Sequence, residues 1–187
     1  MGEKVHMIIK TTAVPEERWR IDLNDSLSPL RNFKQIDSFD PTNVQITNLG
    51  VVGNIPASEW IDKASYVNGI PLDITCLDAI RRQSYPIPNN WKATQSHPIM
   101  LVFAGRLIMK KESVARKVIE QQTFTDRQGK KSTRPVESTV MVPESFPFVP
   151  ILMWIPSNNP LYPSSSLFFA GNGRGYLDQN CFLPILV

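Results

Sequence analysis

The chain has 187 residues, of which 42% are hydrophobic and 20% charged, with a formal net charge of +3 and a mean hydropathy of −0.17. This length fits one domain with a sizeable core, and the composition excludes general disorder. The two cysteines exclude a disulfide scaffold and a zinc module built on several cysteines. Proline, at 16 residues, is unusually frequent and disfavours a helical bundle.

The first half of the chain reads as short strands with two or three short helices between them. A helix is expected over 56–65, with Trp60 and Ile61 as its buried residues. Apolar and alternating runs predict strands over 5–12, 19–23 and 44–52. Gly50 predicts a bend in the last of these strands.

The strongest helix signal covers residues 74–83. Asp73 is the predicted N-cap, and Thr75 with Asp78 fits a weak capping box. Arginines in the last turn suit the helix dipole, and two prolines soon afterwards end the helix. The apolar stripe of this helix consists of Ile74, Leu77 and Ile80.

A buried strand is predicted over 98–109, with Gly105 as a bend. The stretch 112–122 is compatible with a helix or with a strand. The strand is preferred, because residues 126–129 form a turn sequence and β-favouring residues continue to 142. We therefore expect a long β-hairpin arm over about 113–142.

The basic excess of the chain lies in one segment. Residues 106–134 contain nine basic and three acidic side chains, a net charge of +6. This is typical of a patch that faces nucleic acid or the acidic face of a partner, and equally of a solvated hairpin. The candidate patch consists of Arg106, Lys110, Lys111, Arg116, Lys117, Arg127, Lys130, Lys131 and Arg134.

The segment 143–187 is apolar and rich in proline. Three runs of aliphatic residues, beginning at Pro98, Pro150 and Pro184, predict core strands entered from proline turns that restrict pairing to an edge or a short stretch. We expect the uncharged end, 181–187, to cover a sheet edge of the same domain or a neighbouring subunit. The candidate assembly interface consists of Phe146, Phe148, Trp154, Phe182, Leu183, Ile185 and Leu186.

Catalytic, metal-binding and cofactor-binding patterns are not found. His6 and His97 lack partners at metal-ligand spacing, and Cys76 and Cys181 read as small buried hydrophobic residues. The glycine-rich stretch 171–175 does not fit a dinucleotide fingerprint and reads as a turn. No run of apolar residues is long enough for a membrane span, and the first residues do not resemble a signal peptide.

The sequence thus predicts a β-rich α+β fold with a mostly antiparallel sheet, barrel or sandwich. It divides into a core domain 1–142, which includes the protruding basic hairpin 106–142, and the segment 143–187, packed on that domain or on a neighbour. No enzyme and no cofactor are expected.

The expected function is that of a structural or assembly protein whose partners are other protein subunits. In general character the chain resembles a virion component of the phage tail, baseplate, capsid or matrix type. A virion or cytoplasmic location is expected. The alternatives are a small nucleic-acid-binding protein that uses 106–134, and an enzyme with an unrecognised Cys/His site.

Overall fold

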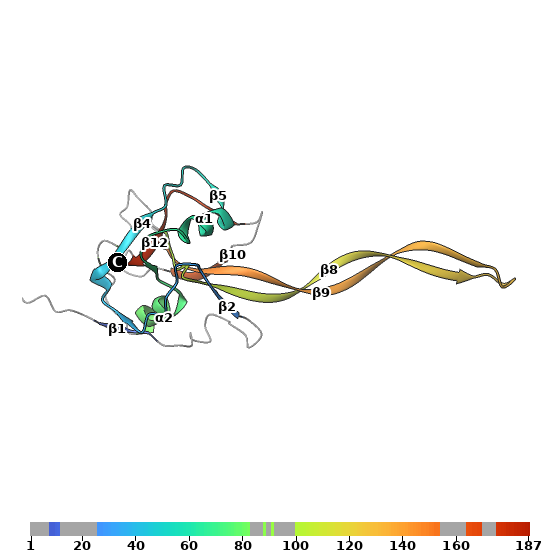
Figure 1. Ribbon diagram of the computed structural model, residues 1–187, viewed down its shortest axis with the longest axis horizontal. Coiled ribbons are helices and arrows are strands. Elements are labelled where there is room, and N and C mark those ends of the chain that lie inside the picture. The colour runs from blue at the N-terminus through green and yellow to red at the C-terminus, as the bar shows by residue number, and fades with distance from the viewer. Residues whose placement is uncertain are drawn as a thin grey trace, which may run out of the picture. The chain divides into compact units, whose positions relative to one another are not determined.

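The structure is a computed structural model that describes residues 8–11, 26–82, 88, 91, 100–153, 164–169 and 175–187. Within these residues the fold is β-rich, with two α-helices and a curled, mostly antiparallel sheet, which confirms the predicted class (Figure 1). The chain divides into two compact units, residues 1–110 with 146–187, called the body below, and residues 111–145, called the arm.

An eight-stranded sheet is the largest element of the fold. Its pairs are antiparallel apart from the parallel pair of β7 with β12. Two of its strands lie off the main path, β10 (Ser164–Phe169) beside β9 and β6 (Ile70–Pro71) beside β12. The main path follows the order β2 (Ser26–Pro29), β8 (Arg106–Thr125), β9 (Lys131–Met153), β7 (Met100–Val102), β12 (Cys181–Leu186) and β4 (Val44–Asn48).

Short elements connect the strands of this sheet. β4 forms only the first part of the strand expected over 44–52. It ends at Asn48, and the chain turns at Gly50, which has φ +66°, without resuming the strand over 51–52. A 3-10 turn, Pro41–Asn43, leads into β4. Two further antiparallel pairs are β1 (Ile9–Lys10) with β3 (Ser38–Phe39) and β5 (Ile55–Pro56) with β11 (Tyr176–Leu177).

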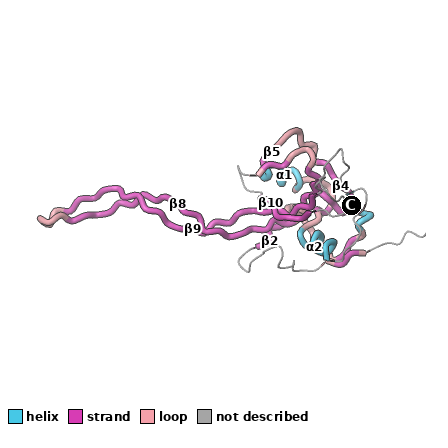
Figure 2. Tube along the Cα trace, turned by 180° about the vertical axis from the view of Figure 1, so that it is seen from behind, coloured by secondary structure: helices cyan, strands magenta, loops and turns pink. Residues whose placement is uncertain are grey.

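Helices cover both faces of the central strands. Leu101 of β7 belongs to the hydrophobic cluster that contains the buried side chains of α2 (Ile74–Arg82). The next residue, Val102, belongs to a second cluster, which contains those of α1 (Ala57–Ala64). Because successive side chains of a strand point to opposite faces, α2 covers one face and α1 the other (Figure 2). Double cover explains why these strands are apolar throughout.

The helix α2 confirms the prediction for 74–83. Oδ1 of Asp73 accepts hydrogen bonds from the backbone N–H groups of Thr75 and Cys76. The predicted capping box of Thr75 with Asp78 is not formed, because the Thr75 hydroxyl donates to Asp73 and Asp78 pairs with Arg82. The predicted apolar stripe is buried at all three positions, Ile74, Leu77 and Ile80.

The three runs that begin with proline lie side by side as β9, β7 and β12, which confirms them as core strands. The expected role of the prolines is wrong, because Pro150 and Pro184 lie inside their strands. Their carbonyls accept hydrogen bonds from Phe103 and Leu72. The N–H and C=O of a strand residue face the same edge, so the nitrogen of each proline faces the edge on which β7 lies. The hydrogen-bonded pairs of β7 include residues 151–153 of β9 and 181–182 of β12, and therefore neither proline, so the missing N–H is tolerated.

The uncharged end of the chain is an interior strand. β12 pairs with β4 on one side and with β7 and β6 on the other. Leu183 is 0% and Ile185 3% exposed. Of the two places expected for the tail, the structure puts these two side chains inside their own sheet, which already covers them. Physically, an apolar strand without charge is best placed between two others, where both faces are buried.

Some predicted features lie outside the described residues. They are the strand over 19–23, His6, His97, Trp154 and residues 171–174 of the glycine-rich turn.

Candidate functional site

The arm is a two-stranded ribbon formed by parts of β8 and β9 (Figure 1). At its tip, Asp126 Oδ1 accepts a hydrogen bond from the backbone N–H of Lys130, and the N–H of Gly129 donates to the Asp126 carbonyl. Gly129 has φ +80°, a region that glycine adopts without steric strain. This geometry is a tight hairpin turn with a left-handed residue at its end, which confirms the predicted turn and the strand reading of 112–122.

The backbone groups of the arm alternate between the partner strand and the outer edges. The N–H of Asp126 donates to the carbonyl of Lys130, so even-numbered residues near the tip face the partner strand. At the other end of β8, the carbonyl of Gly105 accepts from Leu30, on the side of β2. Both ends agree, and odd-numbered residues of β8 therefore face its outer edge.

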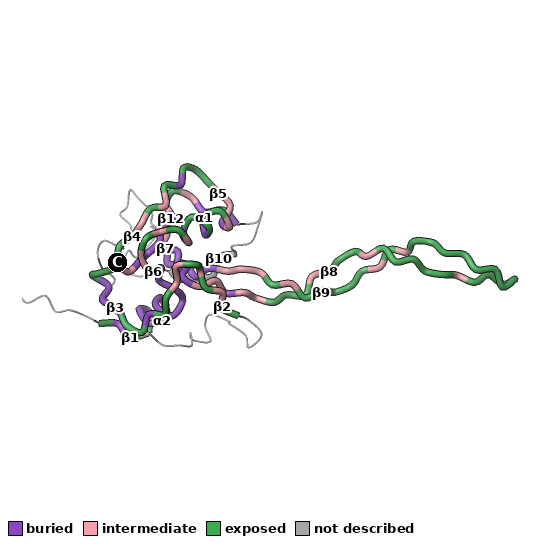
Figure 3. The backbone as a smooth tube through the Cα atoms, in the orientation of Figure 1, coloured by how far each residue is buried: buried purple, intermediate pink, exposed green. Residues whose placement is uncertain are grey.

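Side chains of the arm alternate between two faces as well. No arm residue is buried, and every half-buried one is even-numbered (Figure 3). The odd-numbered face carries all four threonines of the arm, together with Ile119 and Met141, which are exposed there at 71% and 63%. The even-numbered face carries the apolar residues Val114, Val118, Phe124, Val136, Val140 and Val142.

Side-chain contacts join the two strands across the ribbon. In the cation–π contact of the arm, the guanidinium carbon of Arg134 lies 4.0 Å from the centre of the Phe124 ring. These pairs fix the register of β8 against β9, but exposed ion pairs contribute little to stability. The contacts are the ion pairs Arg116–Glu144 and Lys117–Glu137, the ring contact Phe124–Arg134 and the hydroxyl pair Thr123–Thr133.

Positive charge is concentrated at the tip. Residues 124–134 contain four basic side chains and one acidic, Asp126, whose carboxylate is used in the turn. The remainder of the arm contains three basic and four acidic residues. Within the arm, whose residues are all described, no carboxylate pairs with Arg127, Lys130 or Lys131. The predicted basic patch is thus reduced to a cationic tip with a net charge of +3.

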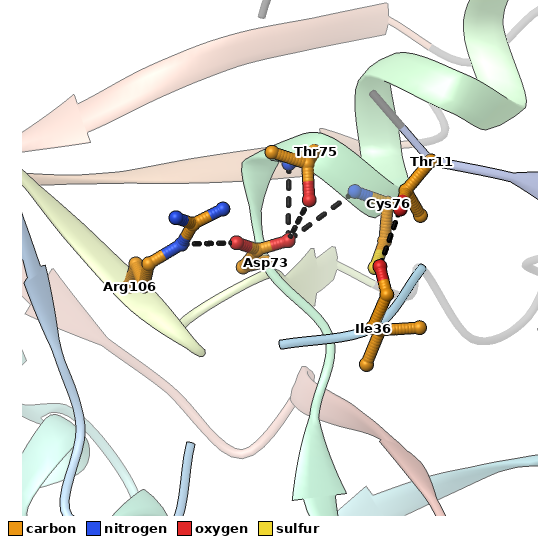
Figure 4. Close-up of polar contacts among 6 residues, drawn as sticks. All are labelled: Thr11, Ile36, Asp73, Thr75, Cys76 and Arg106. Atoms are coloured by element: carbon orange, nitrogen blue, oxygen red, sulfur yellow. Dashed lines mark hydrogen bonds and ion pairs between the residues drawn. The ribbon is translucent and has the colours of Figure 1, made fainter. Parts of the chain in front are cut away.

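Two members of the predicted patch, Arg106 and Lys110, belong to the body. Arg106 Nε donates to Asp73, which is only 1% exposed (Figure 4). The guanidinium of Arg106 also lies 5.0 Å from the Phe33 ring. Arg106 therefore balances a buried carboxylate, and its own side chain is only 14% exposed, which sets it apart from the exposed cations of the predicted patch. Lys110 lies 5.8 Å from the ring of Phe148.

Both cysteines are free and buried. Burial is the main cause that raises the pKa of each thiol, above the usual range for Cys76 and to about 12 for Cys181. The nearby carboxylates of Asp73 and Asp178 raise them further. A thiol that stays protonated is a poor nucleophile, so the surroundings of both cysteines, as far as the structure describes them, disfavour the thiolate.

Most of the candidate interface residues that the structure describes pack within or against the two hydrophobic clusters of the body. Phe146 and Phe148 are half-buried in the part of β9 that belongs to the body, and both have further contacts there. Phe182 and Leu186 are half-buried in β12 and pack against the core. Within the described chain, exposed large apolar side chains are most frequent in the arm, which contains Ile119, Val140, Met141 and Val142. The apolar face of the arm can be recognised in the sequence from valines spaced two and four residues apart.

Comparison of the chain with known protein families, curated proteins and solved structures gives no match. The described residues contain no helix with the length and apolar character required to cross a membrane. In the same ranges, no group of three or more His, Cys, Asp or Glu side chains is arranged to hold a metal ion.

Proposed function

We propose that the protein is a structural subunit of a larger protein assembly and that the arm docks on a neighbouring subunit. The observation that carries this proposal is a ribbon of 35 residues, 111–145, in which no side chain is buried. For the type of assembly, the composition predicts a viral or phage particle, and this stays a prediction.

The energetics of an isolated ribbon support this role. Ordering one residue costs about 1–2 kcal/mol of conformational entropy, and a two-stranded hairpin alone in water is marginally stable at best. The arm contains six apolar residues on one face, and no layer within the described part of the chain buries them. Contact with a second protein supplies the missing burial, at about 25 cal/mol for each Å² of apolar surface.

The native mass of the protein tests the proposal. In an arm-excised variant, Asn-Gly replaces residues 112–144 and joins Lys111 to Ser145 by a preferred two-residue hairpin turn. We expect the full-length chain to form a larger species in light scattering and the excised chain to be monomeric, with the melting temperature of the body retained. Assembly of the excised chain to the same mass would contradict the proposal.

A second candidate function is nucleic-acid binding by the cationic tip, which the net charge of +3 over 124–134 favours. If the four basic side chains contact phosphates, log K falls with log salt at a slope of roughly −3.6. Replacing Lys130 and Lys131 with serine lowers the magnitude of that slope by about 2. Retention on DNA without this salt dependence, or none at all, contradicts the second candidate.

A further inference from the structure

The two outer edges of the arm differ in their ability to pair with another strand. Odd-numbered residues face outward, and in the arm part of β9 two of them are prolines, Pro135 and Pro143, which have no N–H to donate. β8 contains no proline over 111–125. Among the described residues, no third strand pairs with either edge of the arm, since β2 reaches only to the position of Met109. The β8 edge is therefore a complete and open ladder.

The sequence of β8 is complementary to itself about Val118. When two copies of the strand run antiparallel with Val118 opposite Val118, each Arg116 lies opposite a Glu120. Lys117 then lies opposite Ile119, and no two like charges meet over 111–125. Opposite charges directly across a ladder are favourable and like charges are unfavourable, so this register is selected by charge.

Neighbouring registers lack this complementarity. An axis at Lys117 places two lysines opposite each other, and axes at Arg116 and Glu120 do the same with two arginines and two glutamates. An axis at Ile119 loses the opposition of Arg116 to Glu120. A parallel pair in register aligns every charge with its own kind. Val118 is thus the one centre between Arg116 and Glu120 that pairs opposite charges.

We propose that the partner of the arm is a second copy of this chain, bound through the outer edge of β8 in an antiparallel pair with its two-fold axis at Val118. This inference rests on the proposed function and specifies the partner and the surface. The pair is isologous, as most two-fold interfaces are. Lys117 and Ile119 are outward-facing and exchange backbone hydrogen bonds, whereas Val118 lies at a non-hydrogen-bonded position, where side chains approach most closely.

The ion pairs already present in the arm are compatible with this arrangement. Arg116 pairs with Glu144 of its own chain and is 60% exposed, so its guanidinium can contact Glu120 of the second copy as well. Within the arm, whose residues are all described, no cation pairs with Glu120. Ile119, 71% exposed, gains a neighbour in the Lys117 side-chain stem of the second copy.

Cross-linking at the axis tests the pairing directly. In Val118→Cys, two thiols face each other with Cα atoms about 4.5 Å apart, within the range of a disulfide. We expect oxidation by diamide to give a covalent dimer, while Thr139→Cys on the outward side of β9 stays monomeric on a denaturing gel. Cys76 and Cys181 do not interfere because both are buried. A Val118→Cys protein that does not cross-link overturns the proposal.

A proline pair supplies a second test. Ile119→Pro removes an outward N–H from β8 and leaves the bonds to β9 intact, whereas Thr139→Pro makes the same change on the edge that already holds prolines. The expected native mass is one chain for Ile119→Pro and two chains for Thr139→Pro and the unmodified protein. A monomeric unmodified protein contradicts the pairing, as does a dimeric Ile119→Pro variant.

Charge reversal tests the register and separates the two proposals. Glu120→Arg brings two arginines opposite each other and is expected to weaken dimerisation at least tenfold, and adding Arg116→Glu restores opposite charges and dimerisation. Glu112→Arg, the same charge change at a position that this register places opposite Phe124, is the control. If these variants and Ile119→Pro all assemble normally while the arm-excised chain is monomeric, the β8 seam is wrong and the docking role of the arm stands.

Discussion

The long strands β8 and β9 run through both the body and the arm, but the two regions differ in what covers these strands. In the body, β9 lies in a sheet between two hydrophobic clusters, and Val149 and Leu152 are fully buried. In the arm, the continuation of β9 has a single strand beside it and no buried residue. Strand pairing is thus common to both regions, and the second layer is what distinguishes the buried core from the exposed ribbon.

This comparison predicts that the same kind of substitution has large effects in the body and small effects in the arm. Four experiments test it, beginning with the largest expected effect.

Deleting residues 182–187 removes most of β12, the strand between β4 and β7. The loss exposes both neighbours and several side chains that are each worth about 1.5–3 kcal/mol on burial, which exceeds the margin of a typical domain. We expect an unfolded chain by near-ultraviolet circular dichroism. A folded, merely smaller species would instead show that the tail serves assembly.

Asp73→Ala removes the cap of α2 and leaves Arg106 without its partner. Breaking a buried ion pair from one side costs about 3–5 kcal/mol, measured here as a lower urea midpoint. Asp73→Asn is the control, because its amide oxygen still caps the helix, and we expect a smaller loss. Equal losses would mean that the cap contributes nothing measurable.

Two glycines compare the regions at the level of backbone. A Cβ at Gly105 would lie 2.5 Å from the Pro71 carbonyl oxygen and 3.0 Å from the Asp73 Cβ, so Gly105→Ala should cost about 1–3 kcal/mol. At Gly129 a Cβ meets nothing within 4 Å, and only the positive φ of +80° opposes it. Gly129→Ala should therefore leave the unfolding midpoint of the body unchanged, and a comparable loss at both sites would contradict the division into body and arm.

Replacing Lys130 and Lys131 with serine has the smallest expected effect, within about 0.5 kcal/mol, since the two side chains are exposed and make no ion pair in the described arm. Calorimetry of the double variant measures it. Unfolding of this variant would show that the tip belongs to the core of the molecule.

Local sequence was sufficient where neighbours in the chain determine the structure. The helix over 74–82 follows from its cap and apolar stripe, and the hairpin turn from Asp126 and Gly129, because these signals act within a few residues. The positions of the valines and prolines in the arm can also be read from the sequence. Which edge of the ribbon can pair with another strand follows only when the direction of each backbone group is known.

Contacts between distant residues were decided only by the tertiary structure. Arg106 counts as one charge of a basic segment until the fold brings it against Asp73, and the tail 181–187 reads equally well as an interface or a core strand until β4 and β7 are placed on either side of it. The physical reason is the same in both cases. The burial of a side chain and the pairing of a strand depend on which distant residues the fold places beside them, and composition and periodicity do not specify those residues.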